Sequence, residues 1–153
     1  MTTTQLNACL HAHIPVSRHM GLQVLHLDAR SIRVGLPLAL NLNPHGTVFG
    51  GSLTALGLAT AWMLLHARFA AAGLPVKLVG KRSECDFLAP ANGDCVAETV
   101  CDADTLDALF AGYRRQGRMR QALQTVIRVG AVEVAHHRGL YTALDPESDR
   151  RRP

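Results

Sequence analysis

Charged and aromatic side chains are both scarce in this sequence of 153 residues, at 18% and 5% respectively. Two basic stretches, "GYRRQGRMR" and the terminal "ESDRRRP", hold much of the positive charge behind the net value of +4. Neither interleaves aromatic residues with its arginines, as a surface that stacks nucleic-acid bases would. We therefore expect no nucleic-acid partner and interpret both stretches as solvated surface, with an anionic small ligand as the alternative.

Closely paired cysteines are also missing, because Cys9, Cys85, Cys95 and Cys101 form no CxxC motif. The eight histidines do not recur with cysteine or carboxylate at the spacing of metal ligands, so the sequence predicts no metal site. No basic start followed by an apolar core opens the chain. These absences favour a cytoplasmic protein with reduced thiols.

The longest apolar run covers residues 48–65, which carry no charge over about the length that a membrane-spanning helix needs. The run contains three glycines and two threonines and leads directly into His66 and Arg68. The stretches on either side of it alternate as strands do. We therefore expect a helix buried in a protein core and no membrane partner.

Helical and extended patterns alternate along the chain. Helices are expected at residues 4–13, at 51–73, where apolar residues point in nearly every direction, and at 104–118, where the pattern is amphipathic. Strands are expected at residues 21–28, 31–38, 76–90, 94–102, 121–130 and 132–144.

One antiparallel sheet of about six strands, curled around the long helix, satisfies these elements because each apolar face can cover the other. The chain length suits one domain with one core. We therefore expect an α+β fold in which residues 1–144 form the domain and residues 145–153 form a charged, mobile tail.

The stretch "NPHGTVFGGSL", residues 43–53, places paired glycines at the start of the long helix, which later carries Trp62. With "IPVSRHMGLQV", "FLAPANGD" and the order of elements, it resembles the hot-dog fold of thioesterases and dehydratases. More narrowly, it is similar to the bacterial thioesterase domain that is sometimes fused behind a GNAT-type acetyltransferase. The resemblance covers residues 14–144.

The resemblance implies hydrolysis of an acyl thioester of coenzyme A or of acyl carrier protein, within fatty acid metabolism. Coenzyme A would then be part of the substrate, and no separate cofactor is expected. The resemblance also implies a homodimer or a dimer of dimers, with each active site at the subunit interface.

Paired glycines at a helix start have a chemical use. The first N–H groups of a helix lack intrahelical partners and lie at the positive end of the helix dipole. If Gly50 and Gly51 begin the helix, a thioester carbonyl could approach these groups closely because no Cβ intervenes. We predict that the Gly51 amide stabilises the oxyanion of a tetrahedral intermediate. The alternative is that the glycines only permit tight packing.

Polar residues around the motif are predicted to assist. Asn43, held extended by Pro44, could orient the carbonyl or the attacking water, while Ser52 could supply a hydroxyl or merely cap the helix. The further residues that we expect to bind the substrate are His45, Thr47, Phe49, Gly50, Thr54, Trp62, Lys81 and Arg82.

Two of these assignments have a specific reason. Lys81 and Arg82, like Arg114 or Arg115, could meet the phosphates of coenzyme A or the acidic surface of a carrier protein. Trp62 could line an acyl tunnel, although a buried tryptophan is more often part of the core.

The catalytic base does not follow from the resemblance. Many related thioesterases begin the helix with His-Gly-Gly and carry a carboxylate about two turns further on. This chain has Phe49 and Leu56-Gly57-Leu58 at those places, and no Asp or Glu lies between Asp28 and Glu84.

Three answers stay open. Glu84 or Asp86, which alternate along the strand after the helix, could reach the helix start as a base, or could form ion pairs instead. His45 could serve as the base from the loop, since histidine side chains commonly act as general bases. Without any base, the protein would bind acyl thioesters and not cleave them. A 3-hydroxyacyl dehydratase is a more distant alternative on the same fold.

Overall fold

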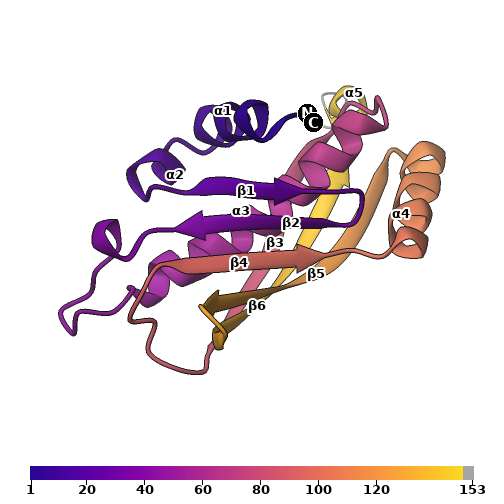
Figure 1. Ribbon diagram of the computed structural model, residues 1–153. Helices are drawn as coiled ribbons and strands as arrows, with labels where there is room; N and C mark the ends of the chain where they lie inside the picture. Colours follow the sequence, from indigo (N-terminus) through magenta and orange to yellow (C-terminus); the bar gives the residue numbers. More distant parts are fainter. Residues whose placement is uncertain (150–153) are drawn as a thin grey trace.

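The computed structural model describes residues 1–149 and shows a curved antiparallel sheet of six strands that holds one long helix (Figure 1). The strand order is β1-β2-β4-β5-β6-β3. The elements are α1 Thr3–His13, α2 Val16–His19, β1 Gln23–Leu27, β2 Ser31–Leu36, η1 Leu38–Leu40, α3 Gly50–Ala71, β3 Lys77–Phe87, β4 Cys95–Val100, α4 Ala103–Gln116, β5 Arg118–Val129, β6 Val132–Leu144 and α5 Pro146–Asp149. The expected α+β fold is confirmed.

The central helix α3 is the core of the domain. Leu56, Leu64 and Phe69 are completely buried along its length. Among the described residues, α3 is the one helix long and apolar enough to cross a membrane, but 61% of its most apolar window is buried inside the fold. This burial is that of a core helix wrapped by a sheet.

The two edges of the sheet differ. At the β1 edge, the side-chain amide of Asn7 in α1 hydrogen-bonds the backbone of Val24. Asn7 Oδ1 accepts from the Val24 N–H at 2.7 Å, and Asn7 Nδ2 donates to the Val24 carbonyl at 3.3 Å. His11 Nε2 lies 2.9 Å from the Leu22 carbonyl beside it. The outer edge of β3 has no strand partner within residues 1–149. Within residues 1–149, the β3 edge is therefore more open to a second chain than the β1 edge.

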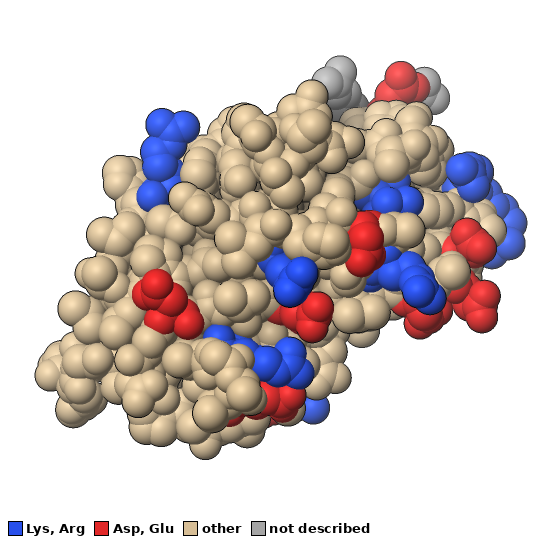
Figure 2. Space-filling view, viewed as in Figure 1, with Lys and Arg blue, Asp and Glu red and all other residues tan. Residues whose placement is uncertain are grey.

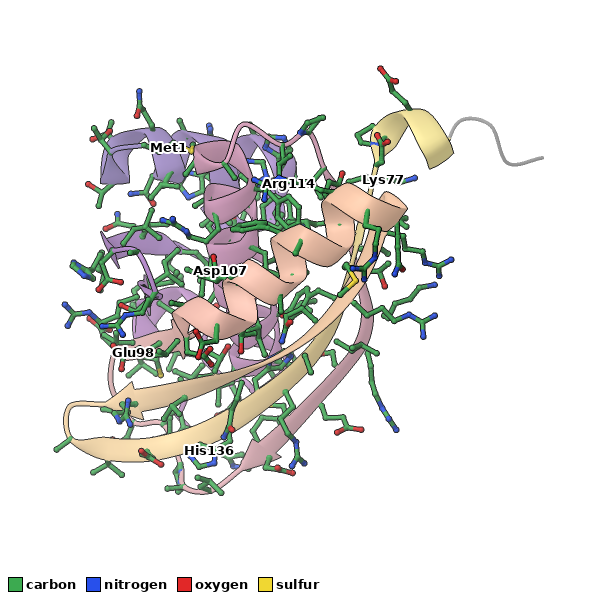
Figure 3. The ribbon with its side chains drawn as sticks, turned by 90° about the vertical axis from the view of Figure 1, so that its right-hand side faces the viewer. Met1, Lys77, Glu98, Asp107, Arg114 and His136 are labelled. Carbon is green, nitrogen blue, oxygen red and sulfur yellow. The ribbon has the colours of Figure 1, made fainter. Side chains whose placement is uncertain are left out.

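The strands β5 and β6 curve strongly, so that the sheet has two distant ends (Figure 3). Lys77 and Arg114 lie near one end, and His136 lies near the other. The start of α3 belongs to the His136 end, because Phe87 pairs with Ala135 and packs its ring against Gly50.

Short helices are where the structure departs from the sequence patterns. The patterns do not predict α2, the 3-10 helix η1 or α5, each of which is too short for a helical repeat to show. The predicted tail is anchored at its beginning, since the Asp145 N–H donates to the Gly117 carbonyl at 2.8 Å. The last part of that tail, residues 150–153, lies outside the described residues.

Candidate active site

The start of α3 offers two backbone N–H groups without a partner. Gly51 is exposed and Gly50 is half-buried. Within residues 1–149 neither N–H donates to an acceptor, whereas the N–H groups of Ser52 and Leu53 reach the Phe49 carbonyl at 2.9 and 3.1 Å. The free pair lies at the positive end of the helix dipole, where a ligand oxygen would be stabilised.

Aromatic rings explain why both positions are glycine. A Cβ added at Gly51 would lie 2.3 Å from Cε1 of Phe49, and one added at Gly50 would lie 3.1 Å from Cζ of Phe87. Each ring is 57% exposed. The missing Cβ atoms let both rings lie against the helix start, and they leave room for a carbonyl beside two apolar walls.

Asn43 holds together the loop that leads into α3. Its Oδ1 accepts from the N–H groups of His45 and Thr47 at 2.8 and 3.2 Å, and its Nδ2 donates to Thr47 Oγ1 at 2.8 Å. The Asn43 N–H also donates to the Thr47 carbonyl at 2.8 Å. Because the amide is engaged within its own loop, these contacts give no support to its predicted use on a carbonyl or a water. Its observed task is to position the loop.

The hydroxyls of Thr54 and Ser52, near the helix start, differ in their hydrogen bonding. Thr54 Oγ1 donates to the Gly50 carbonyl at 3.0 Å. Ser52 is half-buried, and its hydroxyl makes no hydrogen bond within the described part of the chain. The N-cap of α3 is Phe49, with no side-chain cap. The alternative that Ser52 caps the helix is therefore wrong, and its hydroxyl is available to a ligand.

Glu84 and Asp86 point away from the central helix of their own chain. Phe87 packs on the start of α3, so alternation along β3 sends both carboxylates to the outer face of the sheet. There Glu84 Oε1 lies 2.8 Å from Arg82 Nε, and Asp86 Oδ2 lies 3.2 Å from Arg138 Nη2. The prediction that either carboxylate reaches the helix start is wrong within one chain, and the ion-pair alternative holds.

The predicted basic residues are also distant from the glycines. Arg82 is paired with Glu84 on the outer face, and Lys81 is exposed at a bulge of β3. Arg114 lies at the end of the sheet opposite to His136, and thus far from the start of α3 (Figure 3). On the face in Figure 2, charged side chains lie both on the α4 side and over the strands of the sheet, while residues 38–49 contain no Lys, Arg, Asp or Glu. No predicted cation flanks Gly51 in its own chain.

An apolar pocket of about 280 Å³ lies beside α3. Gly51, Ala55, Leu58 and Trp62 share one face of the helix because they are spaced by three and four residues. The pocket therefore continues the face on which Gly51 stands. The residues that line it are Ile14, Val16, Ala55, Leu58, Ala59, Trp62, Leu78, Gly80 and Tyr141.

Trp62 is held firmly at the far end of this pocket. Its Nε1 donates to the Leu78 carbonyl at 3.4 Å, and its ring stacks on His66 with the centroids 5.0 Å apart. The ring thus belongs to the core on one side and lines the pocket on the other. This position is compatible with both interpretations of Trp62, as a wall of an acyl tunnel and as part of the core.

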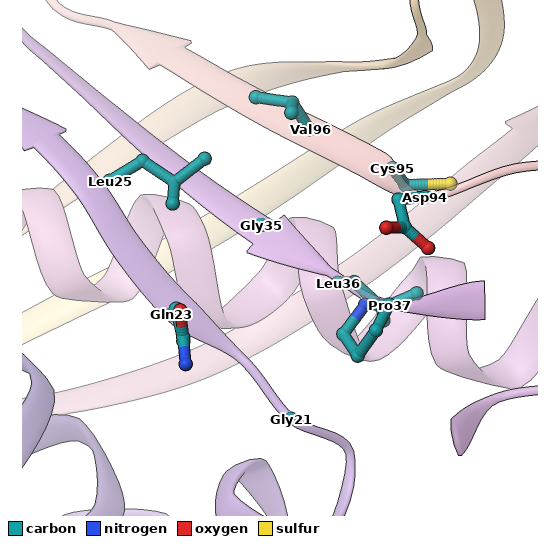
Figure 4. Close-up of a pocket in the computed structure, with 9 residues that line it drawn as sticks. All are labelled: Gly21, Gln23, Leu25, Gly35, Leu36, Pro37, Asp94, Cys95 and Val96. Carbon is teal, nitrogen blue, oxygen red and sulfur yellow. The ribbon is translucent and has the colours of Figure 1, made fainter. Parts of the chain in front are cut away.

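A second cavity, of about 290 Å³, opens on the outer face of the sheet over β1, β2 and β4 (Figure 4). The cavity exists because Gly35 has no side chain. The exposed Leu25 side chain lies over Gly35, and its Cδ1 would be 3.2 Å from a Cβ added at Gly35. Gln23 and Val96 flank Gly35 in register. None of the predicted site residues lines this cavity.

Sequence reasoning missed His137 and Ser83. His137 is completely buried on β6, and its Nε2 lies 2.8 Å from Ser83 Oγ on β3. Burial lowers the pKa of His137 below its ordinary value, which keeps the imidazole neutral at neutral pH. The two residues are distant in sequence, and only the pairing of β3 with β6 brings them together, so no local pattern could have found them. No cluster of three or more metal-ligating side chains occurs in residues 1–149.

Comparison with known proteins assigns the chain to a family. The family model described as "Putative thioesterase (yiiD_Cterm)" matches residues 3–145. The chain belongs to this family. The resemblance to hot-dog thioesterases, inferred from the glycine motif and the order of elements, is thereby confirmed.

Solved structures share this fold at low sequence identity. A protein of unknown function from Chlorobaculum tepidum TLS is 23% identical, with 93% of each chain covered and a TM-score of 0.86. A putative thioesterase from Shewanella oneidensis is 23% identical, with 93% of this chain and 96% of that chain covered and a TM-score of 0.83. A thioesterase from Haemophilus influenzae is 18% identical, with 94% and 91% covered and a TM-score of 0.71.

Proposed function

We propose that this member of the thioesterase family hydrolyses acyl thioesters, with the N–H groups of Gly50 and Gly51 polarising the thioester carbonyl. The observation that carries the proposal is the pair of unengaged N–H groups at the exposed start of a long buried helix. Such preorganised donors stabilise the oxyanion of a tetrahedral intermediate, and the loss of one costs on the order of 3 kcal/mol in barrier height.

The acyl chain of the substrate would lie along the helix face that Gly51 begins. That face leads into the apolar pocket of about 280 Å³ that Trp62 bounds. Ligand pockets commonly span roughly 300–1,000 Å³, so this pocket lies just below that range. It favours an acyl group of short or medium length over a long fatty chain.

The active form would be a homodimer that joins the two β3 edges. An unpaired edge strand is a ready template for a second chain, and the β1 edge is already covered by α1. Phe49, Phe87 and Leu88 expose 57%, 57% and 53% of their surfaces near this edge, and a partner would cover them. Lys81 of the partner would then approach the phosphates of coenzyme A or of a carrier protein.

Hydrolysis is tested with a panel of acyl-CoA thioesters of increasing length, read with a thiol reagent. The informative variant is Gly51→Val, because its side chain would occupy the approach of the carbonyl. Gly35→Val, on the outer face of the sheet, is the matched control. We expect turnover by the wild type and the control and none by folded Gly51→Val. Wild-type rates in Gly51→Val would remove the helix start from the mechanism.

Binding without turnover is the second candidate function, because Glu84 and Asp86, the predicted carboxylate bases, form ion pairs on the outer face of the sheet and do not face the start of α3. It is measured by titrating the protein with a non-hydrolysable thioether analogue of acyl-CoA. Saturable binding, with no thiol released from any thioester of the panel, would favour this candidate over hydrolysis.

A further inference from the structure

Two arginines line a pocket of about 330 Å³ between α4 and the last turn of α3. Arg68 belongs to that last turn, and Arg30 belongs to the turn that joins β1 to β2 (Figure 1). Arg68 follows Gly51 by 17 residues, which corresponds to about 26 Å along the helix axis. None of the residues that line the pocket belongs to β3. The pocket is therefore separate from the start of α3 and from the edge at which a second chain would pair.

Arg68 has a buried donor without an acceptor. Its chain neighbours Ala67 and Phe69 are buried in the core, while Arg68 itself is half-buried. Its Nε is shielded from solvent and makes no hydrogen bond to the described residues, and no carboxylate among them forms an ion pair with its guanidinium. A buried polar group without a partner costs stability, and in a folded protein it commonly marks a position that bonds to water or to a ligand.

The backbone of Arg30 is fixed beside the start of α4. Its N–H donates to Asp28 Oδ1 at 2.8 Å, and its carbonyl accepts from the Cys101 N–H at 2.7 Å. The Arg30 side chain is exposed and forms no ion pair within residues 1–149. Two guanidinium groups from different elements are thus available to an occupant of one pocket.

The carboxylates near the pocket do not neutralise these two arginines. Asp28 accepts three hydrogen bonds from groups of its own turn, at 2.7 to 2.9 Å. Asp102 caps α4 and accepts from the N–H and the hydroxyl of Thr105 at 2.7 and 2.9 Å. Asp107 lines the pocket and is exposed, without an ion pair to either arginine in the described part of the chain. The pocket therefore carries two cations and one free carboxylate.

The remaining wall of the pocket is mostly apolar. One face of α4 supplies the lining residues Ala103, Leu106, Asp107 and Phe110. Leu106 is buried, and the Phe110 ring packs edge-on against Phe69 of α3 with the centroids 5.2 Å apart. An occupant thus meets an aromatic ring as well as the charged groups. The volume of about 330 Å³ lies within the range common for ligand pockets.

We propose that this pocket is a second binding site, for a small organic phosphate with an aromatic body, of the size of a mononucleotide. A phosphate monoester carries about two negative charges at neutral pH, which matches two guanidinium groups that each donate in a planar fork. Asp107 accepts from a hydroxyl or amino group of the ligand, and Phe110 packs against its body. The site lies outside the machinery of the proposed hydrolysis, so binding is measured without any thioester.

Isothermal titration calorimetry of the full chain with AMP tests the site. We expect the wild type to bind AMP and Arg68→Gln to bind it about 10- to 100-fold more weakly, because a hydrogen bond to a charged group is lost. Arg18→Gln is the matched control, since Arg18 is exposed on α2, at the opposite end of the molecule from α4 (Figure 1), and should keep the wild-type affinity. No binding by the wild type at millimolar AMP, or equal losses in both variants, would overturn the proposal.

Two further probes separate the parts of the ligand. Inorganic phosphate presents the anion alone, and adenosine presents the aromatic body alone, so each should bind more weakly than AMP. Phosphate that binds as tightly as AMP would overturn the contact with the aromatic wall. Adenosine that binds as tightly as AMP would overturn the contact with the arginines.

Thermal unfolding distinguishes a binding arginine from a structural one. Since Nε of Arg68 has no partner among the described residues, Arg68→Gln should have a Tm at least as high as the wild type when no ligand is present. AMP should raise the Tm of the wild type and of Arg18→Gln, and leave that of Arg68→Gln unchanged. A lowered Tm in Arg68→Gln together with undiminished AMP binding would make Arg68 a structural residue and overturn the proposal.

Discussion

Asn43 shows how one side chain of the motif acts through the backbone. Its amide joins His45 and Thr47 into the loop before α3. Asn43→Ala removes these contacts, so we expect the free energy of unfolding to fall by about 1–3 kcal/mol. Because the helix start is displaced with the loop, kcat should fall as well. Urea denaturation and kinetics on one preparation measure both.

The matched variant is Asn43→Asp, which keeps the Oδ1 acceptor but replaces the Nδ2 donor by a second, negatively charged carboxylate oxygen. It should cost less stability than Asn43→Ala and retain more activity. An Asn43→Ala protein with unchanged stability and a lowered kcat would instead return Asn43 to the direct catalytic role that the sequence suggested.

Two glycines of α3 should respond in opposite ways to alanine. Alanine favours a helix by about 1 kcal/mol over glycine. At Gly51 the neighbouring Phe49 ring is exposed and can turn aside, so we expect equal or higher stability in Gly51→Ala. At Gly57 the new Cβ would meet Cβ of the buried His137, and overpacking should cost about 1–3 kcal/mol. The midpoints of urea denaturation test the contrast, and a stabilised Gly57→Ala would contradict it.

The sequence identified the helix start correctly, because paired glycines before a long apolar run carry a local signal. Its two carboxylate candidates for the base do not face the helix start in one chain. Glu84 and Asp86 stood out by their charge, yet whether a strand residue faces the helix or the solvent depends on register, which a bulge between Gly80 and Arg82 shifts. The contact between Ser83 and His137 carries no such signal, since it arises only from the pairing of β3 with β6.

The packing of α1 on α3 should make the fold sensitive to acid. Cys9 Sγ lies 3.2 Å from Nε2 of His66, and burial, with a smaller contribution from His13, lowers the pKa of His66. The pKa of His137 is lowered by burial too. Both imidazoles take up protons more readily in the unfolded chain, so the unfolded state binds more protons once the pH drops below 6.5.

The free energy of unfolding should therefore decrease as the pH falls from 7 to 5. Urea denaturation at several pH values measures it. His66→Gln should reduce this dependence, because it removes one of the two buried imidazoles. A wild-type stability that rises toward pH 5 would contradict the prediction.

At the level of elements, periodicity was sufficient for the long helices and the strands. The expected helix at residues 51–73 corresponds to α3, and the expected strand at 132–144 corresponds to β6 residue for residue. The sequence did not predict the short helices α2, η1 and α5, because a single helical turn contains no hydrophobic repeat. Periodicity also says nothing of which strands become neighbours.

The oligomeric state belongs to the whole molecule. We expect two chains of 16.5 kDa to sediment together, joined at the β3 edge. Leu88→Glu adds a charge beside this edge, where Leu88 is 53% exposed in a single chain, and should shift the protein to monomers. Val100→Glu is the control, at a residue 58% exposed at the end of β4.

Sedimentation velocity of the wild type and the two variants gives the answer. Dissociation in Val100→Glu but not in Leu88→Glu would move the interface away from β3. A wild-type monomer at every concentration would show that one chain must complete the site alone.

The covered β1 edge has a consequence for how these molecules can aggregate. The Asn7 side chain caps the backbone of Val24 on the β1 edge. In the described residues, β3 is then the edge strand left for pairing with another chain. Molecules with one open sheet edge can form dimers but cannot form filaments, because each molecule in a filament must pair through two edges. Asn7→Ala removes both hydrogen bonds to Val24 and so uncovers the β1 edge. With two open edges, the protein is expected to polymerise.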